Sequence, residues 1–168
     1  LLLSGSVLYA TAYQGRVAAL AAGSGRMFWS RELSGYTGMS ESAEALYITD
    51  QDGLLWALDK RGGRALWKSD ELRGRQLSAP VSQGGYLVVG DYQGYLHWFD
   101  MHSGMIVART RVEEPMVRYS NLADEYTHDY SEDRQLLSAP VVDGRRVYAM
   151  DKRGVLAAFE VTLIEEGQ

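Results

Sequence analysis

Three carboxyl groups recur at one position of this sequence, and their spacing makes them its first candidates for chemistry. Each stands three residues before a glycine, and the pairs are Asp50 and Gly53, Asp91 and Gly94, and Asp151 and Gly154. A carboxylate can act as a general base or bind a metal ion, but a catalytic carboxylate is normally unique in its chain. An aspartate that recurs with a glycine suits a turn, where its oxygens accept backbone N–H groups. We therefore predict that all three aspartates hold turns and that none is catalytic.

The histidines offer no alternative centre. His97 lies inside the apolar run YLHWF, His102 lies in the turn-like stretch MHSG, and His128 is the third. None has the H-x-x-x-H or H-E-x-x-H spacing of zinc ligands. The chain has no cysteine, which excludes thiolate metal sites and cysteine nucleophiles, and it has no G-x-S-x-G motif. The sequence therefore predicts no catalytic residue, no metal and no cofactor.

Charge and hydropathy exclude further classes of protein. The net charge of −5 opposes nucleic-acid binding, and no apolar run is long enough to cross a membrane as a helix. GSGR at 23–26 and RGGR at 61–64 resemble phosphate-binding loops, but neither leads from a strand into a helix, so we predict hairpin turns there. Because the sequence begins without Met or a basic leader, we expect a fragment or a processed product.

The recurring glycine belongs to an internal repeat that runs through most of the chain. Aligned on Gly15, Gly53, Gly94 and Gly154, four segments match: YATAYQGRVAAL, YITDQDGLLWAL, VVGDYQGYLHWF and YAMDKRGVLAAF. In three copies a second glycine follows ten residues after the first. Fourteen residues after the first glycine of these copies are Trp29, Trp67 and Ala108. Glycine suits turns of positive φ, so each copy predicts strands joined by tight turns.

Each repeat predicts a four-stranded antiparallel sheet. LSAPV, at 77–81 and 137–141, is the expected first strand, with its proline near the start. Three further strands follow it in each repeat, and the tryptophan is expected at the end of the third of these, packed between neighbouring repeats. Runs such as LLWAL at 54–58 are apolar on both faces, which indicates sheets covered on both sides. Sheets covered by copies of themselves are propeller blades, so the predicted fold is an all-β, partial β-propeller.

The repeats predict four blades in a single domain, at about 1–34, 35–75, 76–110 and 137–168. The first glycine spacings, 38 and 41 residues, fit a propeller repeat, and the last blade is too short for an outer strand. The surplus at about 111–136 holds seven acidic residues and three arginines. It is either a solvated loop or a partner-contact loop whose candidate residues are Tyr119, Asp124, Glu125, Tyr126 and Tyr130.

Three segments, YQGRVAALAAGSGRMFW, LVVGDYQGYLHWFDMHSG and RQLSAPV, resemble the C-terminal half of the BamB family, whose repeats also occur in quinoprotein (PQQ-dependent) dehydrogenases. The resemblance implies half of an eight-bladed ring from a lipoprotein on the periplasmic face of the outer membrane. It implies a non-enzymatic scaffold that binds the POTRA domains of BamA, and nascent outer-membrane proteins are further possible partners. The anchoring cysteine is absent here, and the family's main partner-contacting positions map onto no residue of this chain.

Two alternatives accompany this interpretation. A fragment of a quinoprotein dehydrogenase would share the repeat, although four repeats cannot enclose a central cofactor. A propeller from another assembly or sensor protein would share the repeat alone. A half-ring would also leave apolar faces on its first and fourth blades and an unpaired strand edge on the fourth. Such surfaces favour association, so we expect this chain to form a homodimer.

Overall fold

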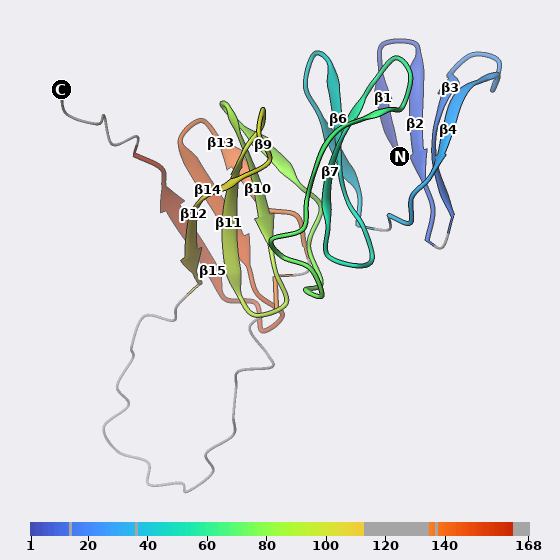
Figure 1. Cartoon of the computed structure of the whole chain (residues 1–168). Coiled ribbons are helices and arrows are strands. Elements are labelled where there is room, and N and C mark those ends of the chain that lie inside the picture. Colours follow the sequence, from blue (N-terminus) through green and yellow to red (C-terminus); the bar gives the residue numbers. More distant parts are fainter. Residues whose placement is uncertain (14, 36, 113–134, 137, 163–168) are drawn as a thin grey trace, which may run out of the picture.

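The computed structural model describes residues 1–13, 15–35, 37–112, 135–136 and 138–162. Its regular elements are all strands, and they form four antiparallel sheets in sequence order (Figure 1). Within these residues, no helix has the length and apolar character needed to cross a membrane. The predicted all-β partial propeller is confirmed.

The strands of each sheet follow one another along the chain, so that each sheet is a meander. The first sheet contains β1 (Leu2–Ser4), β2 (Val7–Thr11), β3 (Arg16–Ala21) and β4 (Met27–Glu32). The second contains β5 (Met39–Glu41), β6 (Ala45–Thr49), β7 (Leu55–Asp59) and β8 (Ala65–Ser69). The third contains β9 (Val81–Gln83), β10 (Tyr86–Gly90), β11 (Tyr95–Asp100) and β12 (Ile106–Arg111). The fourth contains β13 (Val141–Asp143), β14 (Arg146–Met150) and β15 (Leu156–Glu160).

The fourth sheet differs from the other three in its number of described strands. The fourth sheet has three strands among the described residues, in the order β13-β14-β15. Strand β15 is therefore the last described strand of its sheet, where the other three sheets continue into an outer strand.

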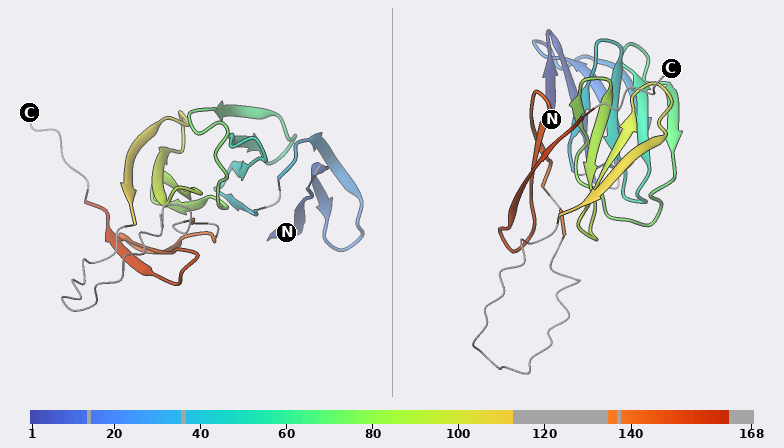
Figure 2. Two further views of the ribbon diagram at one scale, coloured as in Figure 1. Left: turned by 90° about the horizontal axis from the view of Figure 1, so that it is seen from below. Right: turned by 90° about the vertical axis from the view of Figure 1, so that its left-hand side faces the viewer.

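The sheets are arranged radially, with the first strand of each sheet innermost. Strand β9 contacts both β5 and β13, and Figure 2 shows the four sheets following one another along an arc. The phrase LSAPV is not wholly a strand, because β9 begins at Val81 and β13 at Val141. The residues before β9 still bond to the sheet, since Ser78 N–H donates to Gly90 O at 2.8 Å and Ser78 Oγ accepts from Gly90 N–H at 2.9 Å.

The inner sheets are buried on both faces, whereas the outer sheets are not. Every residue of β6 is buried, as are four of the six residues in β11. Strand β15 instead alternates between exposed and half-buried residues. Three hydrophobic clusters lie between successive sheets, and each leucine or valine fully buried there contributes roughly 1.5–3 kcal/mol. The blades therefore stabilise one another.

Candidate functional site at the third blade interface

The three recurring aspartates all lie at hairpin turns. In each, Oδ1 accepts the backbone N–H groups of the residues two and four positions further along, at 2.8–3.0 Å. The glycines that follow, Gly53, Gly94 and Gly154, have φ between 80° and 85°, a conformation that costs little only without a Cβ. The first repeat has Ala12 in place of the aspartate, so the turn around Gly15 lacks this carboxylate.

The second carboxylate oxygen takes a different donor in each repeat. Asp50 Oδ2 accepts from Trp56 Nε1 at 2.7 Å, and Asp151 Oδ2 accepts from the Arg153 guanidinium at 3.1 Å. Asp91 Oδ2 accepts from Arg75 at 2.6 Å and lies 2.9 Å from His97 Nε2. Each aspartate thus links its turn to a neighbouring side chain.

The Asp91 cluster is the most buried of the three. Both Asp91 and His97 are fully enclosed, at 0% and 1% exposure. Burial alone would raise the pKa of Asp91, but hydrogen bonds from His97, from the Tyr95 backbone and from Arg75 outweigh it and lower that pKa. Among the described residues, no group of three or more acidic or histidine side chains could hold a metal ion. The hydrogen bonds of Asp91 join its turn to His97 and to Arg75.

The tryptophans lie on β4 and β8, the strands that follow the second glycine of each repeat, but in the middle of those strands and not at their ends as predicted. Trp29 Nε1 donates to Lys60 O of the next sheet at 2.9 Å, and Trp67 Nε1 donates to Met101 O at 2.9 Å. Each indole also lies on a turn glycine of that next sheet. A Cβ on Gly63 would lie 2.5 Å from Trp29 Cε3, and the equivalent position in the next pair is equally close. The indoles thus join the first sheet to the second and the second to the third.

The interface between β9–β12 and β13–β15, here the third interface, is built differently. In the first two sheets an alanine on the third strand pairs with the tryptophan, as in Ala19↔Trp29 and Ala57↔Trp67. In the third sheet the pair is reversed, as Trp98↔Ala108. Trp98 Nε1 donates within its own sheet, to Gln83 Oε1 at 2.9 Å. No indole therefore extends from β12 to the fourth sheet.

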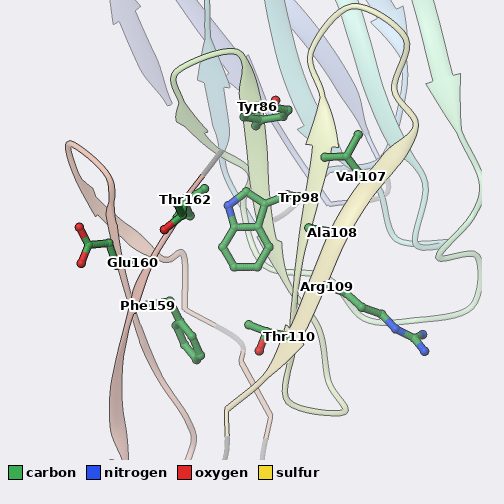
Figure 3. A pocket seen from close by; sticks show the side chains of 10 residues that line it. Tyr86, Trp98, Val107, Ala108, Arg109, Thr110, Phe159, Glu160 and Thr162 are labelled. Atoms are coloured by element: carbon green, nitrogen blue, oxygen red, sulfur yellow. The ribbon is translucent and has the colours of Figure 1, made fainter. Parts of the chain in front are cut away.

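A cavity of about 480 Å³ lies at this third interface, and we call it the interface pocket. Its lining residues are Tyr86, Trp98, Val107, Ala108, Arg109, Thr110, Phe159, Glu160, Val161 and Thr162. Figure 3 shows Trp98 at its centre, with Phe159 and Ala108 on opposite sides. The two charged side chains, Arg109 and Glu160, point away from Trp98, and Glu160 is paired with Arg145 at 3.2 Å. The interior of the pocket is therefore neutral, with aromatic walls from Tyr86, Trp98 and Phe159.

The remaining candidate residues have varied positions. The loop residues Tyr119, Asp124, Glu125, Tyr126 and Tyr130, like His128, lie outside the described residues. The ends of the expected insertion belong to the framework, because Val112 and Leu136 are 3% and 1% exposed and Leu136 N–H donates to Asp91 O at 3.0 Å. His102 lies in the β11–β12 turn, where its N–H donates to Asp100 Oδ1 at 3.1 Å.

Sequence reasoning missed the interface pocket, although a signal for it was present. The alignment shows Ala108 in place of tryptophan, and it also shows Trp98 where the other repeats have alanine. Only the strand register shows that these two positions face each other across β11 and β12. In the structure the two differences occur at one pair of facing positions, whereas in the sequence they are ten residues apart.

Comparison with known proteins agrees with the repeat architecture. A family model described as outer membrane protein assembly factor BamB matches residues 1–69 and 57–163. The outer membrane protein assembly factor BamB of Alkalilimnicola ehrlichii is 38% identical over 156 residues, which cover 92% of this chain and 36% of that protein. The chain thus spans little more than a third of the length of the curated relatives it matches.

Solved structures give the same fold. The crystal structure of BamB from Moraxella catarrhalis superposes with a TM-score of 0.77 and 26% identity, covering 95% of this chain and 42% of that one. Quinohemoprotein alcohol dehydrogenase from Comamonas testosteroni superposes with a TM-score of 0.69 at 18% identity, covering 89% of this chain and 28% of that one. At this identity the likeness to the dehydrogenase is one of fold alone.

Proposed function

Because the chain belongs to the BamB family of outer membrane protein assembly factors, we propose that it is part of a non-enzymatic scaffold for the assembly and insertion of outer-membrane β-barrel proteins. The observation that carries the proposal is the family match, which extends over nearly the whole described chain. The proposed location is the periplasmic face of the outer membrane, with a lipid anchor elsewhere in the full-length protein.

A scaffold needs rigidity, and the blade contacts supply it. Adjacent sheets are joined by buried side chains and by the Trp29 and Trp67 hydrogen bonds to backbone carbonyl groups. Strands β4, β8 and β12 end their sheets, so their outer edges can pair with an extended partner segment. The proposed partners are the POTRA domains of BamA, bound through the full-length protein, and nascent outer-membrane proteins.

The test is retention of the full-length protein on immobilised POTRA domains of the barrel-inserting subunit. We expect specific retention that persists after a wash at moderate salt. Passage through the column at the rate of an unrelated propeller would contradict the proposed partner.

The acidic segment with Tyr119, Tyr126 and Tyr130 is a proposed contact loop in the same interaction. Replacement of residues 113–134 by a short glycine–serine linker spares the buried framework residues Val112 and Leu136. We expect this variant to be retained more weakly on the POTRA domains, and unchanged retention would eliminate the loop as a contact.

A second copy of the chain is also a proposed partner. Large apolar residues are exposed on the outer sheets, among them Leu3 and Met27 at one end and Val141 and Leu156 at the other. Burying such faces favours association, and uncapped terminal repeats share this property. Light scattering of the isolated chain should therefore report a dimer, and a monomer at all concentrations would contradict the proposal.

A further inference from the structure

We infer that the interface pocket is a docking site for an aromatic side chain, with indole as the best fit, carried on an extended segment of another protein. This proposal goes beyond the scaffold function and does not depend on which partner the scaffold binds. It rests on a comparison of three equivalent interfaces within one chain.

The first two interfaces show what fills this position. In each, an indole from the outer strand of one sheet lies on the next sheet and donates to a backbone carbonyl, that of Lys60 or Met101. Val161 is the equivalent residue of the fourth sheet, since its N–H donates to Arg145 O at 2.9 Å as Lys60 N–H donates to Glu44 O at 3.0 Å. Among the described residues, no indole donates to Val161 O.

The lining of the pocket selects for a neutral aromatic group. Trp98, Phe159 and Tyr86 provide aromatic walls, which prefer another ring in an offset or edge-to-face arrangement. The charged groups of Arg109 and Glu160 point outward, so no charge in the interior would compensate a buried ionic ligand. The volume of about 480 Å³ is large enough for an indole and falls in the range of roughly 300–1,000 Å³ typical of ligand pockets.

The neighbouring strand favours a protein segment over a free small molecule. Strand β12 is the last strand of its sheet, and Val107 on it is 53% exposed beside the pocket. An extended segment that pairs with the outer edge of β12 would place every second side chain on one face of the sheet. One such side chain would reach the space in front of Ala108. This space is open because alanine is smaller than the tryptophan at the equivalent position of the first two sheets.

The test uses two fluorescently labelled peptides of alternating threonine and valine, one with a central tryptophan and one with alanine in its place. Fluorescence anisotropy with the whole chain should show that the tryptophan peptide binds about tenfold more tightly or better, as expected for a buried aromatic anchor. Equal affinity of the two peptides, or no binding of either, would overturn the proposal.

Two variants locate the binding. Ala108→Trp fills the pocket with an indole of the chain itself. Thr110→Glu places a charge at the edge of the pocket with less risk to folding. Each variant should bind the tryptophan peptide about tenfold more weakly. The matched control Leu66→Trp adds an indole to the outer strand of the second sheet, where Leu66 is 43% exposed, and should leave binding unchanged. Undiminished binding by folded Ala108→Trp and Thr110→Glu would contradict the site. So would a structure in which a second copy or the chain's own residues fill the pocket.

Discussion

The first two blade interfaces and the third are formed by the same kind of sheet but differ in the position of their tryptophan. In the first two, a tryptophan on the outer strand reaches across to a glycine turn of the next sheet. In the third, the tryptophan has moved one strand inward, to Trp98, and it bonds within its own sheet. One exchange between paired positions therefore accompanies the replacement of a contact between blades by a pocket between blades.

The turn glycine that receives each indole meets two requirements. Gly63 and Gly104 receive the indoles of Trp29 and Trp67, and their φ angles of 70° and 72° favour glycine. Gly25 has a φ of 69° in the equivalent turn of the first sheet, where no atom lies within 4 Å of an added Cβ. Positive φ is therefore common to these three turns, whereas the close approach of an indole applies to Gly63 and Gly104.

The largest effect is expected from Gly63→Ala, which would break the first interface. This residue has a φ of 70°, and the added Cβ would lie 2.5 Å from Trp29 Cε3. Backbone strain and overpacking together should lower the free energy of unfolding by about 3 kcal/mol, measured by urea denaturation.

The matched control for this substitution is Gly25→Ala in the equivalent turn of the first sheet. Gly25 has a φ of 69°, but no atom lies within 4 Å of its added Cβ. Only the backbone strain applies there, so the free energy of unfolding should fall by about 1 kcal/mol. Equal losses for the two variants would show that the indole contact is unimportant at this interface.

A smaller effect is expected from Trp67→Phe, which keeps an aromatic ring but removes the donor to Met101 O. Loss of one hydrogen bond should cost about 1 kcal/mol. Trp29→Phe should cost a similar amount, because its indole donates to Lys60 O at the same 2.9 Å. A large difference between the two variants, measured by thermal unfolding, would mean that the first two interfaces are not equivalent.

Acid should weaken the Asp91 cluster, which lies where the second and third sheets meet. Because hydrogen bonds from His97, Tyr95 and Arg75 outweigh burial and hold the folded pKa of Asp91 below 3.8, the unfolded chain takes up this proton first as the pH falls. Stability contributed by Asp91 is therefore present above about pH 4 and is lost as the pH falls through the folded pKa. Asp91→Asn should be less stable at neutral pH but should show a flatter decline in acid, and an unchanged decline would contradict this assignment.

Much of the fold could be predicted from the sequence, because its repeat is recognised by glycines and aspartates that act within single turns. Gly53 and Asp50 act within a single turn, so their spacing alone indicates the structure that they form. The strand that follows the second glycine could also be predicted to carry Trp29, but its position in the middle of β4, and not at the end of the strand, could not. The interface pocket could not be predicted, since it depends on the pairing of Trp98 with Ala108 and on the absence of an indole from the facing sheet.

The most direct test of the difference between the interfaces is a crystal structure of the Ala108→Trp variant. We predict that the new indole lies inside the interface pocket between β12 and β15, against Trp98 and Phe159, while the four sheets keep their arrangement. Filling the space should also raise the free energy of unfolding by up to about 1 kcal/mol. An indole turned out into solvent, or a third and fourth sheet forced apart to admit it, would contradict the existence of a ready-made pocket at this interface.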